Sequence, residues 1–106
     1  MKVAFDDDSS YELPSEYLRV YSPSADVKGH GPGQGTLQTG KENVMIIDVL
    51  PVGNYAVRLV FDDGHNTGLY TWTLLFELGR DMEENWQAYL DRLTAAGHSR
   101  TGQSEG

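Results

Sequence analysis

The sequence predicts an α+β domain in which two C-terminal helices pack on one face of a small, mostly antiparallel sheet, as a two-layer sandwich. Two apolar runs, 44–50 and 55–61, flank a turn signal and predict a β-hairpin. Further along, apolar residues within 86–93 recur at the spacing of an amphipathic helix. A chain of 106 residues is expected to form one domain, here residues 1–100, followed by a disordered polar tail at 101–106.

The N-terminal third is predicted to begin with a hairpin and to end in a long loop. Apolar residues at 3–5 and 11–13 surround an acidic turn, which indicates two short strands. A short turn or helix follows at Pro14, and the apolar run 17–21 is compatible with a strand. Arg19 interrupts that run, and a lone arginine in such a place is usually a snorkelling or paired structural residue.

The run Val44–Leu50 is the most apolar stretch and is rich in β-branched residues, so we expect a central strand buried on both faces. Pro51–Asn54 supplies the turn, and Tyr55–Phe61 returns as the partner strand. A second turn at Asp62–His65 contains Asp-Gly, a strong hairpin signal, and Leu69 leads back toward the sheet.

Two helices are expected at the C-terminal end. The first is predicted to begin near Thr71 and to end at Gly79. Asp81, with Glu84 three residues later, fits a capping box at the start of the second, and Gly97 fits its end. The stripe expected to face the sheet consists of Trp86, Tyr89, Leu90 and Leu93.

Composition excludes several classes of function. Sixteen acidic residues against eight basic ones give a formal charge of −8, which repels nucleic acid and anionic membranes. The absence of cysteine removes disulfides, thiolate nucleophiles and sulfur metal ligands. No apolar run reaches the roughly 18 residues of a membrane span. A soluble cytoplasmic protein without a cofactor is therefore expected.

His65 is the strongest candidate for a functional side chain, because it follows an Asp-Gly turn where Asp63 could orient its ring. A surface histidine that only makes hydrogen bonds is the alternative. His30 lies in a glycine-rich stretch with Gly31 and Gly33, which could fold back over this turn. That stretch has neither the preceding strand nor the following helix of a nucleotide-binding loop.

Four motifs follow one another along the chain: Glu16–Ala25, Gly29–Gln34, Pro51–Val57 and Asp63–Trp72. In this register they resemble the DUF971 family, which is similar to the N-terminal domain of γ-butyrobetaine hydroxylase. The resemblance extends from about Val3 to Arg100. It implies a two-layer α+β domain that occurs alone or fused to 2-oxoglutarate oxygenases or to Mrp-type iron–sulfur carrier ATPases.

In the hydroxylase relatives this domain holds a structural zinc through three cysteines and a histidine. The resemblance places the cysteine positions at Ser22, Ser24 and Val27, and the histidine at His65. Three thiolates are therefore missing, and no tight zinc site is expected here.

The sequence favours a non-enzymatic accessory or protein-interaction module, because no nucleophile motif, cofactor motif or buried acid pair is visible. The fusions of the relatives suggest an iron–sulfur carrier or an oxygenase-type protein as the partner. The expected contact surface is the glycine-rich loop with the His65 turn, and Arg19 lies among the candidate binding residues. The alternative is a small-molecule or metal-ion site built from His30, His65 and Asp63.

Overall fold

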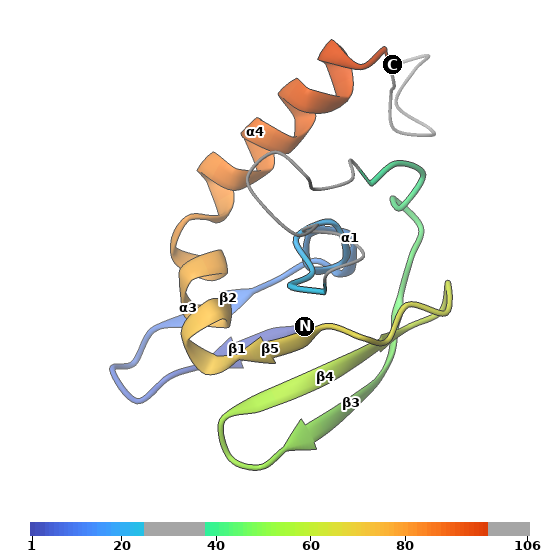
Figure 1. Cartoon of the computed structure of the whole chain (residues 1–106). Coiled ribbons are helices and arrows are strands. Elements are labelled where there is room, and N and C mark those ends of the chain that lie inside the picture. The colour runs from blue at the N-terminus through green and yellow to red at the C-terminus, as the bar shows by residue number, and fades with distance from the viewer. Residues whose placement is uncertain (25–37, 98–106) are drawn as a thin grey trace.

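The computed structural model describes residues 1–24 and 38–97 and shows strands and helices around one main core (Figure 1). The predicted loop residues Val27, His30, Gly31 and Gly33, and the tail 101–106, lie outside the described residues. In chain order the elements are β1 (Lys2–Ala4), β2 (Ser10–Glu12), α1 (Ser15–Val20), β3 (Ile46–Val52), β4 (Ala56–Phe61), β5 (Leu69–Thr71), α3 (Trp72–Arg80) and α4 (Met82–Ala95).

The strands form two antiparallel sheets, which confirms the α+β class. β1 pairs with β2 so that Val3 lies opposite Tyr11, as expected for the N-terminal hairpin. The second sheet has the order β3-β4-β5. Within it β4 is the central strand, and its alternate residues Val57, Leu59 and Phe61 are buried in the core as the period of two predicts.

Residues 17–21 do not form a strand, because Tyr17 to Val20 belong to helix α1. All residues from Glu16 to Val20 are buried, so the helix has no solvent-facing side that would give an amphipathic pattern. A short apolar run cannot distinguish a buried helix from a strand, which is why the prediction was wrong. Tyr17 and Leu18 are completely buried and belong to the main core together with residues of β4.

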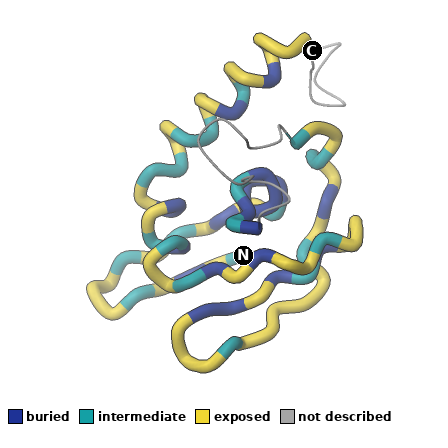
Figure 2. Tube along the Cα trace, in the orientation of Figure 1, coloured by how far each residue is buried: buried dark blue, intermediate teal, exposed yellow. Residues whose placement is uncertain are grey.

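Strand β3 is an edge strand, and the prediction of a central strand buried on both faces is wrong. Among the residues that the structure describes, it pairs only with β4, and its residues 47–51 are all exposed, as the yellow tube along β3 shows (Figure 2). The strand also runs through Pro51, which was expected in the turn. Proline has no N–H for a ladder, so a proline inside a strand indicates the edge of a sheet.

Helix α3 begins as predicted, because the Thr71 hydroxyl accepts a hydrogen bond from the Leu74 N–H at 3.1 Å. Gly79 does not end this helix, which continues to Arg80. Gly79 is buried, and a Cβ there would fall inside van der Waals contact with Cγ of Tyr11. The glycine therefore permits close packing of α3 on β2 and has no capping role.

Helix α4 departs from expectation at its start and in what it covers. Asp81 makes no side-chain capping bond, because its carboxylate pairs with Arg80 at 2.9 Å. The buried stripe residues Tyr89 and Leu93 form a second cluster with Val20 of α1, so this part of α4 packs on α1, while Trp86 also packs against the main core. Gly97 has a φ of 79° just beyond the helix end, as predicted.

Across residues 1–24 and 38–97, no helix combines the length and the apolar character needed to cross a membrane.

Candidate functional site

The turn after β4 is closed by backbone hydrogen bonds. The Phe61 N–H donates to the His65 carbonyl at 2.9 Å, and the Gly64 N–H donates to the Phe61 carbonyl at 3.1 Å. Gly64 adopts a φ of 90°, a conformation in which side chains are disfavoured, and this explains the Asp-Gly pair. The turn fixes the directions in which Asp63 and His65 leave the backbone.

Asp63 accepts hydrogen bonds from three groups. Its Oδ2 lies 2.9 Å from Arg19 Nε and 3.1 Å from Lys41 Nζ, and its Oδ1 accepts from the His65 N–H at 3.1 Å. Partial burial raises the pKa of Asp63, but the three hydrogen bonds and the Arg19 charge outweigh it and lower the pKa to about 2. The carboxylate is therefore ionised at neutral pH and accepts three hydrogen bonds within the protein.

Arg19 reaches this carboxylate from the buried helix α1. The residue is only 7% exposed, and its Nη1 donates a second hydrogen bond to Oε1 of Gln38 at 3.1 Å. A buried guanidinium requires such partners, because an unpaired charge in the interior is costly. Of the two roles considered from the sequence, Arg19 takes that of a paired structural residue.

His65 lies next to the positions that correspond to zinc ligands in the resembling hydroxylases. Its Nε2 is 2.9 Å from the Ser22 hydroxyl, and its ring stacks on Phe61 at a centroid distance of 6.0 Å. The Ser22 hydroxyl also accepts from the Ser24 N–H at 3.2 Å, and the Ser24 hydroxyl is 2.7 Å from Thr67 Oγ1. Three of the four inferred positions therefore come together as a hydrogen-bonded network.

The residues of this network do not fit a structural zinc ion. Serine hydroxyls are neutral at physiological pH and are poor replacements for the thiolates that zinc prefers. Among the residues that the structure describes, no group of three His, Cys, Asp or Glu side chains could hold a metal ion. The hydrogen bonds of Ser22 and Ser24 connect the end of α1 to the turn, so they supply the cross-link that a metal would otherwise make.

Several contacts of this site were not predicted from the sequence. Lys41, Gln38 and Thr67 have no local motif that indicates a role, because their partners lie far along the chain. Tyr70 was placed in a strand, and its buried hydroxyl donates to the Leu18 carbonyl at 2.6 Å. Burial raises the pKa of Tyr70.

Gly68 allows the chain to pass beside the network. A Cβ on Gly68 would lie 2.5 Å from the Ser22 hydroxyl, closer than real side chains approach. A glycine here keeps the 62–68 connection packed against the end of α1.

The hydrogen-bonded residues Asp63, His65, Ser22 and Ser24, which we call the corner, join the end of α1 to the turn after β4. The chain is thus a small α+β domain whose conspicuous histidine belongs to a structural hydrogen-bond network. The sequence matches the family described as "Gamma-butyrobetaine hydroxylase-like, N-terminal" over residues 1–76. The chain belongs to this family. The comparison with curated proteins finds no match.

Solved structures resemble the chain over most of its length. Two solution NMR structures share 49% and 52% of the sequence with TM-scores of 0.79 and 0.78. The first match covers 93% of this chain and 77% of the other, and the second covers 93% and 74%. A crystal structure of a DUF971 family protein of unknown function from Acidithiobacillus ferrooxidans is 43% identical, with a TM-score of 0.62 and coverage of 74% and 78%. The resemblance to DUF971 is thereby confirmed.

Proposed function

We propose that this chain is a protein-interaction module without catalytic activity, and that it contacts its partner through strand β3. The supporting observation is the exposure of large apolar side chains along this edge strand and at the residue before it: Met45 58%, Ile47 63%, Val49 41% and Leu50 39%. We call these four residues the β3 surface. Isolated exposed apolar residues are ordinary, but several together on an edge strand favour an interaction site. Because Val49 and Leu50 point to opposite faces of the sheet, the partner would cover the edge from both sides.

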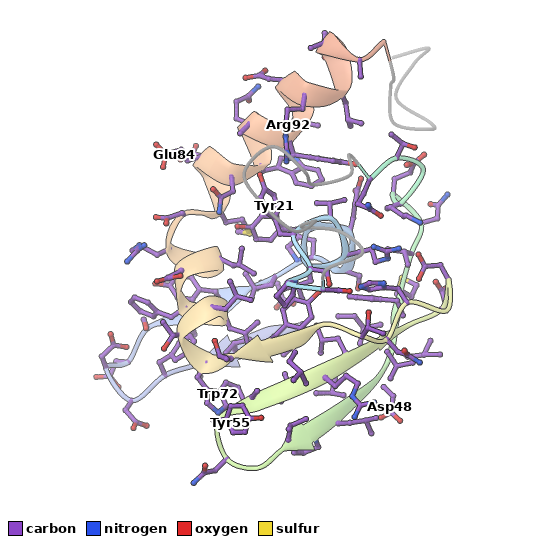
Figure 3. The ribbon with its side chains drawn as sticks, in the orientation of Figure 1. Tyr21, Asp48, Tyr55, Trp72, Glu84 and Arg92 are labelled. Atoms are coloured by element: carbon purple, nitrogen blue, oxygen red, sulfur yellow. The ribbon has the colours of Figure 1, made fainter. Side chains whose placement is uncertain are left out.

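The apolar character continues across the sheet and toward the hairpin end. Leu50 and Leu69 both lie opposite Arg58, one on each side of it, and Leu69 is 41% exposed. Tyr55 and Trp72 lie together at the β3–β4 turn, where Trp72 Nε1 donates to the Asn54 carbonyl (Figure 3). A partner that covers the β3 surface would therefore meet further apolar groups.

The occupant is a folded partner that offers a side-chain surface, and an added strand fits less well. Pro51 has no N–H to donate, and a bulge at Ile47 interrupts the ladder between Ile46 and Asp48. Both features are known devices that protect an edge from pairing with another strand.

The corner around Asp63 is less suited to recognition than the β3 surface. Asp63 already accepts from Arg19, Lys41 and the His65 backbone, and His65 Nε2 already contacts Ser22. These groups already make contacts within the protein, so they offer a partner less than exposed apolar side chains do. The observations on the described residues do not favour the alternative of a small-molecule or metal site at this corner.

The charge of the chain indicates what kind of partner to expect. A formal charge of −8 opposes association of two copies, so the proposed partner is a different protein with an apolar centre and a less acidic rim. We include in the proposal that this chain is cytoplasmic, and that iron–sulfur carrier and oxygenase-type proteins are the first candidate partners to test.

Site-specific photo-crosslinking tests this proposal. A photoreactive amino acid is placed at Ile47, at Leu50 or, as the control, at Thr94, which is exposed near the far end of α4. We expect one cross-linked protein from positions 47 and 50 and none from 94. That protein, once purified, should bind the wild type and lose affinity for Ile47→Asp. Equal cross-linking from all three positions, or none, would refute the proposed surface.

A further inference from the structure

We propose that Arg58, on the face of β4 that points away from the core, determines the specificity of the proposed interaction, and that it binds a glutamate or aspartate side chain set among apolar residues of the partner. This inference rests on the proposed function and adds the chemistry that the partner must offer. Arg58 lies directly between two exposed leucines, Leu50 on β3 and Leu69 on β5. Residues that are directly opposite in antiparallel strands share a face, so the three side chains stand abreast.

The alternation of β4 shows which face carries Arg58. Val57, Leu59 and Phe61 belong to the main core, to which helices α1 and α3 also contribute buried residues. Because successive side chains of a strand point to opposite faces, Arg58 points away from that core. Arg58 is exposed, so the described part of the chain leaves it accessible to another protein.

The guanidinium of Arg58 makes no contact of its own within the described residues. Of the four arginines in 1–24 and 38–97, Arg19 and Arg80 each pair with an aspartate, and Arg92 lies over a tyrosine ring. Arg58 is the one that has no hydrogen bond, ion pair or ring contact through its guanidinium. An arginine stays charged and presents its N–H donors in a planar fork, which can hold a carboxylate through two parallel hydrogen bonds.

The two leucines make an acidic acceptor necessary. Leu50 is 39% exposed and Leu69 is 41% exposed, so a partner that covers both also removes water from Arg58 between them. A charge that is covered without a partner is costly, whereas an ion pair grows stronger when water is excluded. The formal charge of −8 opposes polyanions such as nucleic acid, which favours a single carboxylate within an apolar surface.

Asp48 gives a second expectation of opposite sign. It lies opposite Val60 on the same face, which makes it a diagonal neighbour of Arg58. Its Oδ1 accepts from the N–H of the next residue at 2.9 Å, and among the described residues no ion pair joins it to Arg58. Figure 3 shows Asp48 at the end of the β3–β4 pair away from Tyr55 and Trp72. An incoming carboxylate is attracted by Arg58 and repelled by Asp48, so loss of each charge should change its affinity in opposite directions.

A pair of blocked tripeptides tests the site on the full chain. The probe is leucine–glutamate–leucine, and the matched control replaces its glutamate with neutral glutamine. We expect saturable NMR shifts of the Leu50 and Leu69 methyl groups and of the Arg58 Nε–H with the glutamate peptide at millimolar concentration. The glutamine peptide should bind about two- to fivefold more weakly, as expected for one partly exposed charge pair. Equal affinities for the two peptides, or no response to either, would overturn the inference.

Three variants separate Arg58 from general electrostatic attraction. Arg58→Gln should abolish the preference for the glutamate peptide, and Asp48→Asn should strengthen binding of that peptide about twofold at low salt. Lys2→Gln removes the same positive charge from exposed β1, in the other sheet, and should leave the preference unchanged. Equal effects of Arg58→Gln and Lys2→Gln would contradict the site.

The cross-linked partner distinguishes this inference from the proposed function. Arg58→Gln should weaken its binding about tenfold or more, because the partner's carboxylate would be left covered and unpaired. Weakened binding of Ile47→Asp together with unchanged binding of Arg58→Gln would overturn the carboxylate assignment and leave the β3 surface standing. Unchanged binding of Ile47→Asp would overturn the proposed surface, whereas the peptide titration still decides whether Arg58 selects a carboxylate.

Discussion

Replacing Asp63 with asparagine is expected to destabilise the protein by removing the counter-charge of buried Arg19. The pKa of Asp63 is lowered from 3.8 to about 2, and because solvent screens this partly exposed carboxylate, the shift corresponds to at most about 2 kcal/mol of stability at neutral pH. Loss of hydrogen bonds to a charged group gives a similar figure, about 1.5–3 kcal/mol. We therefore expect Asp63→Asn to lower the free energy of unfolding by about 2 kcal/mol. For a domain of this size the melting temperature should fall by roughly 8–16 °C.

The stability difference between wild type and Asp63→Asn should depend on pH in a definite direction. A carboxyl group whose pKa is lowered in the folded state stabilises the protein above its unfolded pKa, and that stability is lost as pH falls through the folded pKa. The difference between wild type and Asp63→Asn should be complete above about pH 5, about half as large near pH 3 and mostly gone by pH 2.

Urea unfolding followed by tryptophan fluorescence measures this difference. Glu84→Gln is the control, because it makes the same charge change at an exposed position and should shift stability by less than about 0.5 kcal/mol. A loss below about 0.5 kcal/mol for Asp63→Asn, or a loss as large at pH 2 as at pH 7, would refute the role assigned to the Arg19–Asp63 pair.

Three other changes test the packing and the corner. Gly79→Ala should destabilise the protein by about 1–3 kcal/mol although alanine favours helices, because the new Cβ would collide with the Tyr11 ring; a gain in thermal stability would contradict the close packing of α3 on β2. Ser22→Ala should cost about 1–3 kcal/mol in urea unfolding, because the Ser24 N–H and His65 Nε2 lose a buried partner; an unchanged midpoint would show that the network contributes nothing. Zinc chloride should leave the melting temperature unchanged in calorimetry, because Ser22 and Ser24 provide hydroxyls where thiolates would be needed; a rise that depends on zinc concentration would contradict this reading.

Features determined by neighbouring residues were predictable from the sequence. The Asp63-Gly64 turn, the Thr71 cap and the Gly97 terminus each depend on a conformation or hydrogen bond within a few residues. The burial of alternate residues in β4 was also predictable. One face of this strand packs on the core, and side chains in a strand alternate between its two faces. The family resemblance located the corner at His65 by the same kind of local motif.

Features determined by distant contacts were not predictable. The run 17–21 is apolar all round because helix α1 is buried on every side, and its pattern therefore resembles that of a strand. Asp81 matches a capping box in sequence, but the adjacent Arg80 takes its carboxylate. The partners of Arg19 lie 19 and 44 residues away, at Gln38 and Asp63, a separation at which no spacing rule operates.

The error over β3 is the most informative, because it concerns the proposed interaction surface. An apolar strand can be buried within its own domain or exposed and covered by another protein, and its composition does not distinguish the two cases. Pro51 was the available signal for the edge, since a proline within a strand belongs there. A strand that contains this proline is expected to lie at the edge of the sheet.

The most direct test of the central claim is the affinity of the cross-linked partner for two variants, measured by isothermal titration calorimetry. Ile47→Asp places a charge on the β3 surface at a 63% exposed residue, so the fold should be unaffected. His65→Ala alters the hydrogen-bonded corner, and circular dichroism would be used to check that this variant is folded. We expect Ile47→Asp to weaken binding by about tenfold or more, and His65→Ala to change it less than about twofold. Unchanged affinity for Ile47→Asp together with lost binding for His65→Ala would show that the corner, and not β3, contacts the partner.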